Sequence, residues 1–218
     1  LIRDVVFSSV SGQVGNLTSR QYAVYLLSGL IIFTFFQEGI TWGMNSIMER
    51  ADLILKINFK RDIVVISALT MALINFGINL LIIAVIGLVL GIQFSFIGVA
   101  YILLIGLIMF LGMYGISFFT SIWMVYLRDL THITELVLQL MFYASAVFFP
   151  VELIPEKYRF IVELNPIAIF IQSVREALTN QRIINLEFVL GSLAVVIVLV
   201  IVGNIYFKKK VLKVAEHF

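Results

Sequence analysis

The sequence lacks several residues on which soluble proteins build their chemistry. None of its 218 residues is cysteine, so disulfides, thiolate metal sites and cysteine nucleophiles are excluded. Its two histidines, His132 and His217, are far apart in the sequence, which argues against a histidine metal site. Charged residues make up only 13% of the chain, and a formal net charge of +2 is too small to attract nucleic acid. We therefore expect no metal site and no nucleic-acid partner.

Apolar residues dominate instead. They make up 61% of the chain, and the mean hydropathy is +1.09, whereas an ordinary soluble domain is about half apolar and about a quarter charged. Five stretches are long and apolar enough for helices that cross ~30 Å of hydrocarbon, and none shows the alternation of a barrel strand. The composition predicts an all-α integral membrane protein with a single transmembrane domain over 1–218. Its five predicted spans are 22–42, 63–92, 96–126, 134–151 and 188–207.

The lysines and arginines predict the orientation of these spans. Five spans place nine of the 15 cations on one side and six on the other, and Lys208–Lys210 directly follow the last span. Because positive charge favours the cytoplasmic side, we place the nine in the cytoplasm. The segment before residue 22 then lies outside, and the chain starts at Leu1 without an initiator Met. We expect a fragment of a six-span subunit.

The first cytoplasmic connection, 44–62, has apolar residues at helical spacing and charged residues on the other faces. This pattern predicts an amphipathic helix at the membrane surface. It is either a solvated interfacial turn or a docking element for a cytoplasmic partner. The candidate coupling residues are Ile47, Met48, Glu49, Arg50, Asp52 and Lys56.

The second cytoplasmic connection is very short and contains Arg128 and Asp129. One interpretation is purely structural, with Arg128 ending one helix and Asp129 capping the next. The other is that the two residues support an inner gate or the coupling region.

All three prolines, Pro150, Pro155 and Pro166, lie within one predicted outer segment, 150–183. Proline interrupts helices, yet this segment stays apolar, which predicts two short re-entrant or interfacial helices instead of a span. Asn165 and Pro166 form a good N-cap and first-position pair for the second helix. Arg175 lies off the apolar stripe of that helix.

Glu38 is the carboxylate placed well inside a predicted span. Intramembrane acids usually face a cavity or a partner. Glu38 could therefore line a pathway or pair with an arginine, or it could simply meet water near the inner interface. Phe35 and Trp42, on the same span, are further candidates for the lining of a conduit. Asn75, which shares a face of the second span with Asn79, could hydrogen-bond to a neighbouring helix.

Several motifs, taken in order, resemble the membrane subunits of type-2 ABC exporters, in the branch that exports polysaccharides and teichoic acids. They run from about residue 22 to residue 210 and comprise YLLSGL with FF, NSI with LILKINFKRD, YLRDL, SAVFFP, LNP and RE. The family often has proline at position 60, where this chain has lysine. It also often has Ser-Pro-Ile where this chain has Ser145-Ala146-Val147.

The resemblance implies a six-span subunit that forms a homodimer around a conduit in the bacterial cytoplasmic membrane. It also implies two cytoplasmic ATPase subunits, which would bind ATP and Mg, while this chain needs no cofactor. Its 44–62 helix would dock on the ATPase. The implied substrate is a glycan or teichoic acid on an undecaprenyl-type lipid carrier. The chain has no phosphate-binding loop of the Gly-x-x-x-x-Gly-Lys-Ser/Thr type, so the energy would come from another chain.

Two alternative functions stay open on the sequence. One is a type-2 exporter of drugs or lipids, which would share this topology. The other is a membrane-embedded glycan-processing enzyme, which would need a nucleophile with its base or a pair of carboxylates.

Overall fold

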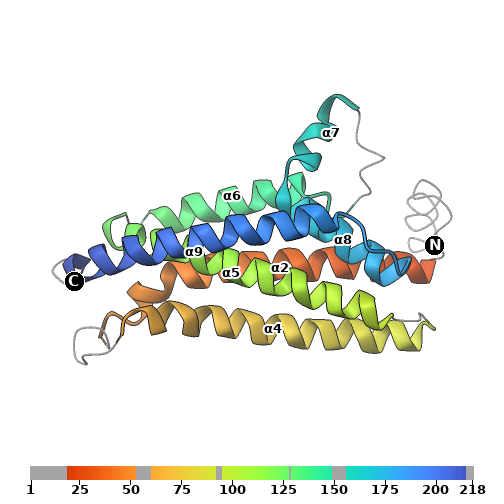
Figure 1. Cartoon of the computed structure of the whole chain (residues 1–218), viewed down its shortest axis with the longest axis horizontal. Helices are drawn as coiled ribbons and strands as arrows, with labels where there is room; N and C mark the ends of the chain where they lie inside the picture. The colour runs from red at the N-terminus through yellow and green to blue at the C-terminus, as the bar shows by residue number, and fades with distance from the viewer. Residues whose placement is uncertain (1–18, 53–59, 92–94, 128, 149–155, 215–218) are drawn as a thin grey trace. The chain divides into compact units, whose positions relative to one another are not determined.

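A computed structural model describes residues 19–52, 60–91, 95–127, 129–148 and 156–214. Seven α-helices are bounded within these residues, and no strand occurs among them (Figure 1). The helices are α2 (Ser19–Glu49), α4 (Asp62–Val89), α5 (Phe96–Tyr126), α6 (Leu130–Ala144), α7 (Glu156–Glu163), α8 (Pro166–Thr179) and α9 (Leu186–Val214). The all-α prediction is confirmed.

Four of these helices are long and apolar enough to cross a membrane. Their spanning parts are Ala23–Glu49, Asp62–Val89, Phe96–Tyr126 and Leu186–Val211. They correspond to four of the five predicted spans, and they support a multi-pass membrane protein. Long runs of leucine, isoleucine, valine and phenylalanine account for this agreement, because such runs are helical wherever water is absent.

The helix at the predicted span 134–151 is shorter than a membrane span. Helix α6 begins at Leu130 and ends at Ala144, so it has 15 residues, about 22 Å at the helical rise. That length is short of the ~30 Å hydrocarbon core, and α6 is not among the candidate spans. Residues 149–155, which include Pro150 and Pro155, lie outside the described residues. A fifth full span therefore stays a prediction.

The first helix does not end where the first span is predicted to end, at residue 42. Helix α2 continues to Glu49, so the first residues of the predicted 44–62 helix belong to α2. Gly43, Met44, Ser46 and Ile47 are buried, and this packing continues the helix past Trp42. Residues 53–59 lie outside the described residues.

The chain divides into two compact units. The first takes Leu1–Phe33, Ile78–Leu103 and Leu140–Asn185, and the second takes Thr34–Gly77, Leu104–Gln139 and Leu186–Phe218. Each unit is described below by itself.

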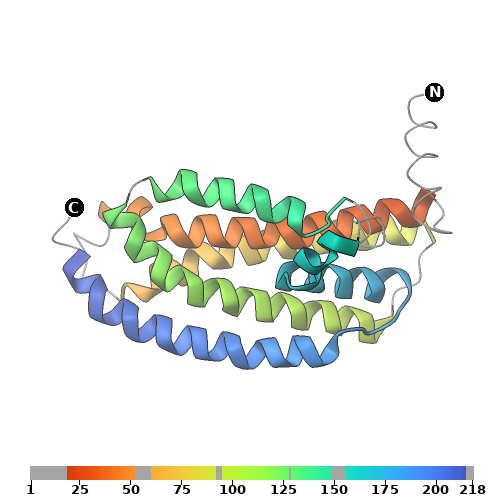
Figure 2. The ribbon, with the colours of Figure 1, turned by 90° about the horizontal axis from the view of Figure 1, so that it is seen from above.

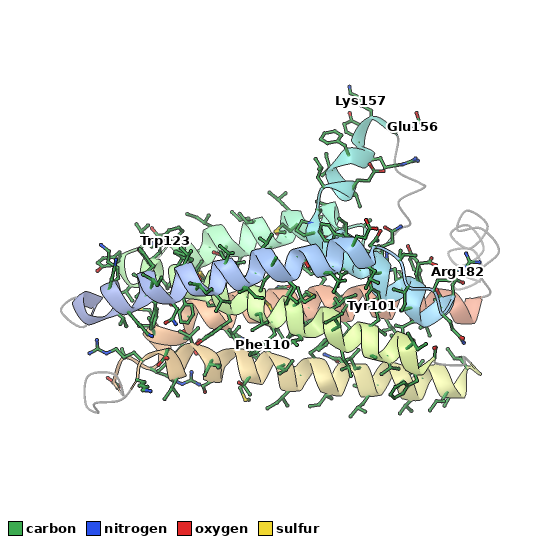
Figure 3. The ribbon with its side chains drawn as sticks, in the orientation of Figure 1. Tyr101, Phe110, Trp123, Glu156, Lys157 and Arg182 are labelled. Atoms are coloured by element: carbon green, nitrogen blue, oxygen red, sulfur yellow. The ribbon has the colours of Figure 1, made fainter. Side chains whose placement is uncertain are left out.

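In the first unit, α8 supplies nine buried side chains. They are Ile167, Ala168, Phe170, Ile171, Ser173, Val174, Arg175, Ala177 and Leu178. The start of α5 is tied to the chain after α8, because the hydroxyl of Tyr101 (Figure 3) donates to the carbonyl oxygen of Ile184 at 2.5 Å. The same unit contains α7, which contacts α8.

In the second unit, α5 and α9 run side by side (Figure 2) and meet through glycines. A Cβ added to Gly203 would lie 2.8 Å from the carbonyl oxygen of Gly115. Nearby, Phe118 and Phe207 pack with ring centroids 5.0 Å apart. Small residues allow this approach, as is typical of helix contacts in membranes. The indole of Trp123 (Figure 3) donates to the hydroxyl of Tyr206 at 3.2 Å.

Candidate functional site

Arg175 lies at the centre of the first candidate site. It is on α8, and only 4% of its surface is exposed. Its guanidinium donates to the carbonyl oxygens of Ala146 at 3.1 Å and Val147 at 2.5 Å. It also donates to the carbonyl oxygen of Tyr25 at 3.2 Å and to the Tyr25 hydroxyl at 3.0 Å. Arg175 thus joins three separate stretches of the first unit, which is possible because a guanidinium presents five donors in a fixed plane.

Gly29 makes room for this guanidinium. It lies one turn after Tyr25 on α2, and a Cβ added there would come 2.5 Å from one Nη atom of Arg175. The same α2 segment supplies the Tyr25 ring, against which the guanidinium packs. The sequence motif YLLSGL therefore has a structural role: its Tyr25 and Gly29 surround the guanidinium of Arg175.

Asn165 fixes the start of α8 as predicted. Its side-chain oxygen accepts a hydrogen bond from the backbone N–H of Ile167 at 3.0 Å, and Pro166 occupies the first turn. Its amide nitrogen donates to the hydroxyl of Ser145 at 2.9 Å and to the carbonyl oxygen of Ala144 at 3.4 Å. One side chain therefore caps α8 and holds the end of α6.

The turn that Asn165 and Arg175 hold has an unusual backbone. Ala146 has φ of 50°, in the left-handed region that L-residues other than glycine seldom adopt. Proline cannot adopt this angle, because its ring fixes φ near −65°. The turn that the chain forms thus excludes proline at this position, where the sequence departs from the Ser-Pro-Ile pattern.

The predicted outer segment contains two separate short helices, α7 and α8, with Leu164 and Asn165 between them. In α7, Glu156 and Lys157 are exposed and project at its beginning (Figure 3). Tyr158, 51% exposed, and Phe160, 55% exposed, are also accessible. The position of the two helices relative to a membrane stays a prediction.

The conduit candidates fall in the second unit. The amide of Asn75 on α4 donates to a carboxylate oxygen of Glu38 on α2 at 3.2 Å, which confirms that Asn75 bonds across to a neighbouring helix. Phe35 is 1% exposed and stacks on Phe76 with centroids 4.3 Å apart, so it packs between the same two helices. Glu38 and Trp42 are half-buried. The conduit role of Phe35, Glu38 and Trp42 stays a prediction.

The coupling candidates differ in accessibility. Ile47 is fully buried and Met48 is half-buried, whereas Glu49 and Asp52 are exposed. Arg50 donates to the carbonyl oxygen of Val64 on α4 at 3.3 Å. Lys56 lies outside the described residues. Among the described candidates, Glu49 and Asp52 are the side chains best placed to reach a partner.

Sequence reasoning did not single out Arg61. Its guanidinium donates to the carbonyl oxygen of Val211 on α9 at 2.9 Å, across 150 positions of sequence. Carbonyls in the last turns of a helix have no partner within the helix and attract cations. A cation beside a predicted span end is the signal that could have indicated such a bond, but the choice of α9 depends on the fold.

The short turn before α6 is described only in part. Asp129 is exposed, and Arg128 lies outside the described residues. One turn further on, His132 lies 3.7 Å from Glu135, and both side chains are largely exposed. This is a surface pair at helical spacing. No metal-binding cluster of three or more His, Asp or Glu residues occurs among the described residues.

Comparisons with known proteins indicate the family of the chain. Residues 1–179 match the family described as ABC-2 type transporter. The chain is similar to "O-antigen export system permease protein RfbA" of Klebsiella pneumoniae, with 30% identity over 195 residues, 89% of this chain and 75% of the relative. A protein of the same description from Myxococcus xanthus is 24% identical over 197 residues, again 89% of this chain and 75% of the relative.

Proposed function

The chain belongs to the ABC-2 type transporter family, as a membrane-spanning permease subunit of an ABC exporter, and from this premise we propose that its cargo is a lipid-linked polysaccharide. The observation that carries the proposal is the 30% identity, over 89% of this chain, to a permease described as an O-antigen export protein. The permease itself is not an enzyme. In the proposed complex, two copies of the subunit form the pathway in the bacterial cytoplasmic membrane.

The proposed partner is a cytoplasmic ATPase that binds ATP and Mg. It would supply the energy, and its closure would act on the end of α2. Support for this docking place comes from the exposed carboxylates Glu49 and Asp52, because charged groups at a rim steer association and fix its register. The hydrogen bond from Arg50 to Val64 joins the end of α2 to α4. A movement of the ATPase against the end of α2 would therefore be transmitted to both helices.

Cargo identity can be tested in a strain that lacks the gene for this subunit. We expect lipid-linked glycan to accumulate on the inner leaflet and to disappear from the cell surface, and the wild-type gene should restore both. If the surface glycan is unchanged and the strain instead becomes sensitive to a drug, the subunit exports drugs. An altered outer-leaflet phospholipid composition with normal glycan would indicate a lipid exporter.

The docking place can be tested by charge reversal. The double variant Glu49→Arg, Asp52→Arg should insert normally but should co-purify less ATPase and lower the transport-linked hydrolysis of ATP. Glu156→Arg, at an exposed site on α7, is the matched control and should change neither quantity. Normal assembly and hydrolysis in the double variant would move the docking site elsewhere.

A further inference from the structure

The accessible side of α2 is mostly polar between residues 34 and 45, in the second unit. Between residues 34 and 45, five polar side chains are half-buried or exposed. Their spacing of i, i+3, i+4, i+7 and i+11 places them on one side of the helix. We call this set the polar face of α2; it consists of Thr34, Gln37, Glu38, Thr41 and Asn45.

The opposite side of the same helix is buried. Phe35, Met44 and Ile47 are at most 1% exposed, and Gly39 and Gly43 are buried beside Met113 and Ser117 of α5. The polar side chains are therefore most of those that α2 leaves available between residues 34 and 45, where Phe36 and Trp42 are also half-buried.

Other helices of the same unit show a different kind of accessible surface. On α4 it includes Met71 and Ile74, and on α9 it includes Val195 and Val198, each at least 51% exposed. Apolar surface of this type suits lipid. Polar side chains at membrane depth are instead found facing a bundle interior or a water-filled cavity. The polar face of α2 therefore does not match a lipid-facing surface.

Glu38 is held in a defined position on this face. The Asn75 amide donates to one of its carboxylate oxygens at 3.2 Å, and a carboxylate has about four acceptor sites in all. Next to it, the hydroxyls of Thr34 and Thr41 and the amides of Gln37 and Asn45 can each donate and accept. The face extends about 16 Å along the helix axis. Such a row suits a ligand that carries many hydroxyl groups along a chain.

We propose that the polar face of α2 lines the hydrophilic pathway and hydrogen-bonds the hydroxyl groups of a glycan chain as it passes. This inference deepens the proposed function and rests on it. The carboxylate oxygens of Glu38, oriented by Asn75, accept hydrogen bonds from the sugar hydroxyl groups. The threonine and amide groups exchange partners as successive sugars move along, because each of them both donates and accepts.

Cysteine substitution tests the water-lined surface directly, because the 218 residues contain no cysteine. Single variants Thr34→Cys, Gln37→Cys, Thr41→Cys and Asn45→Cys are made in the full subunit, assembled with its ATPase in membrane vesicles. We expect a small charged thiol reagent to label them about tenfold faster than Thr70→Cys or Val198→Cys, because the reactive thiolate needs water. Thr70 and Val198 are accessible residues of the same unit on α4 and α9. No labelling at the four positions would overturn the inference.

Export measurements test the role in glycan binding. The variants Gln37→Leu, Thr41→Val and Asn45→Leu should each slow appearance of surface glycan about fivefold, the effect of one lost hydrogen bond. Thr70→Val is the matched control, because the hydroxyl of Thr70 already donates to the carbonyl oxygen of Ile66 within α4. Glu38→Gln keeps the shape of the side chain but makes it a weaker hydrogen-bond acceptor for the sugar hydroxyl groups. This variant should therefore slow export as well.

The failure of this inference and the failure of the proposed function give different results. If the gene deletion abolishes surface glycan but the three apolar variants export normally, the glycan proposal stands and the polar face of α2 is not its path. If the deletion leaves surface glycan unchanged, the proposed cargo is wrong, and with it the glycan ligand inferred here.

Discussion

The guanidinium carbon of Arg175 lies 3.8 Å from the centre of the Tyr25 ring, although the two residues are 150 positions apart in the sequence. The ring faces the cation, and the Tyr25 hydroxyl and backbone carbonyl oxygens accept hydrogen bonds from it. A cation over an aromatic face contributes more where water is excluded. Arg175 is therefore placed to hold α2, α8 and the turn after α6 together in the first unit.

We expect Arg175→Lys to lower the free energy of unfolding by about 2–3 kcal/mol, because an ammonium cannot reproduce the planar set of bonds and leaves buried carbonyls unsatisfied. Thermal unfolding of the purified subunit in detergent measures this loss. Arg182→Lys is the control, since Arg182 is exposed (Figure 3). Equal stability of the two variants would mean that the carbonyls of Ala146 and Val147 find other donors.

Asn165 can be tested by two substitutions that separate its roles. Asn165→Asp keeps the oxygen that caps α8 but loses the donor to Ser145, whereas Asn165→Ala loses both. We expect Asn165→Ala to cost about 1 kcal/mol more than Asn165→Asp, the usual value of an N-cap. Chemical denaturation of both variants gives the comparison. Equal losses would show that the bond to the end of α6, and not the cap, is what matters.

The contact between α5 and α9 depends on Gly203. Adding a Cβ there brings it 2.8 Å from a backbone carbonyl, so Gly203→Ala must push the helices apart and should destabilise the subunit by about 1–3 kcal/mol. Gly191→Ala on the same helix is the control, because its added Cβ meets nothing within 4 Å, and alanine favours the helix. Thermal stability should fall in the first variant and hold or rise in the second.

Arg61 offers a test of coupling through α9. We expect Arg61→Ala to reduce export more than it reduces ATP hydrolysis, because the bond to Val211 joins the start of α4 to the end of α9. Lys60→Ala, which removes the neighbouring exposed cation, should leave the ratio of export to hydrolysis unchanged. If both variants change that ratio equally, local charge explains the effect and the bond to α9 does not.

The long helices of the fold and the beginning of α8 could be predicted from the sequence. Long apolar runs predict spans directly, and Asn165 with Pro166 signals a helix start through its own chemistry. The end of α2 was missed because Met44 and Ile47 continue an apolar pattern that fits a surface helix equally well. The surroundings of Arg175 could not be predicted, since its acceptors at Ala146 and Val147 are backbone carbonyls that every residue possesses. The hydrogen bond between Asn75 and Glu38 could be predicted only in part. A carboxylate or an amide inside a membrane span indicates that a polar partner is needed, but the sequence does not show which residue is the partner.

The left-handed backbone at Ala146 limits how this chain can diverge. Substitution by glycine would relieve an unfavourable angle, whereas substitution by proline is sterically impossible without a new path for the chain. A relative with Ser-Pro-Ile at this turn must present its carbonyls in other directions, so an arginine equivalent to Arg175 would find different acceptors. Exchange of α8 between such a relative and this protein should fail unless the turn, Tyr25 and Gly29 are exchanged with it, so α8, the turn and this part of α2 can only change together.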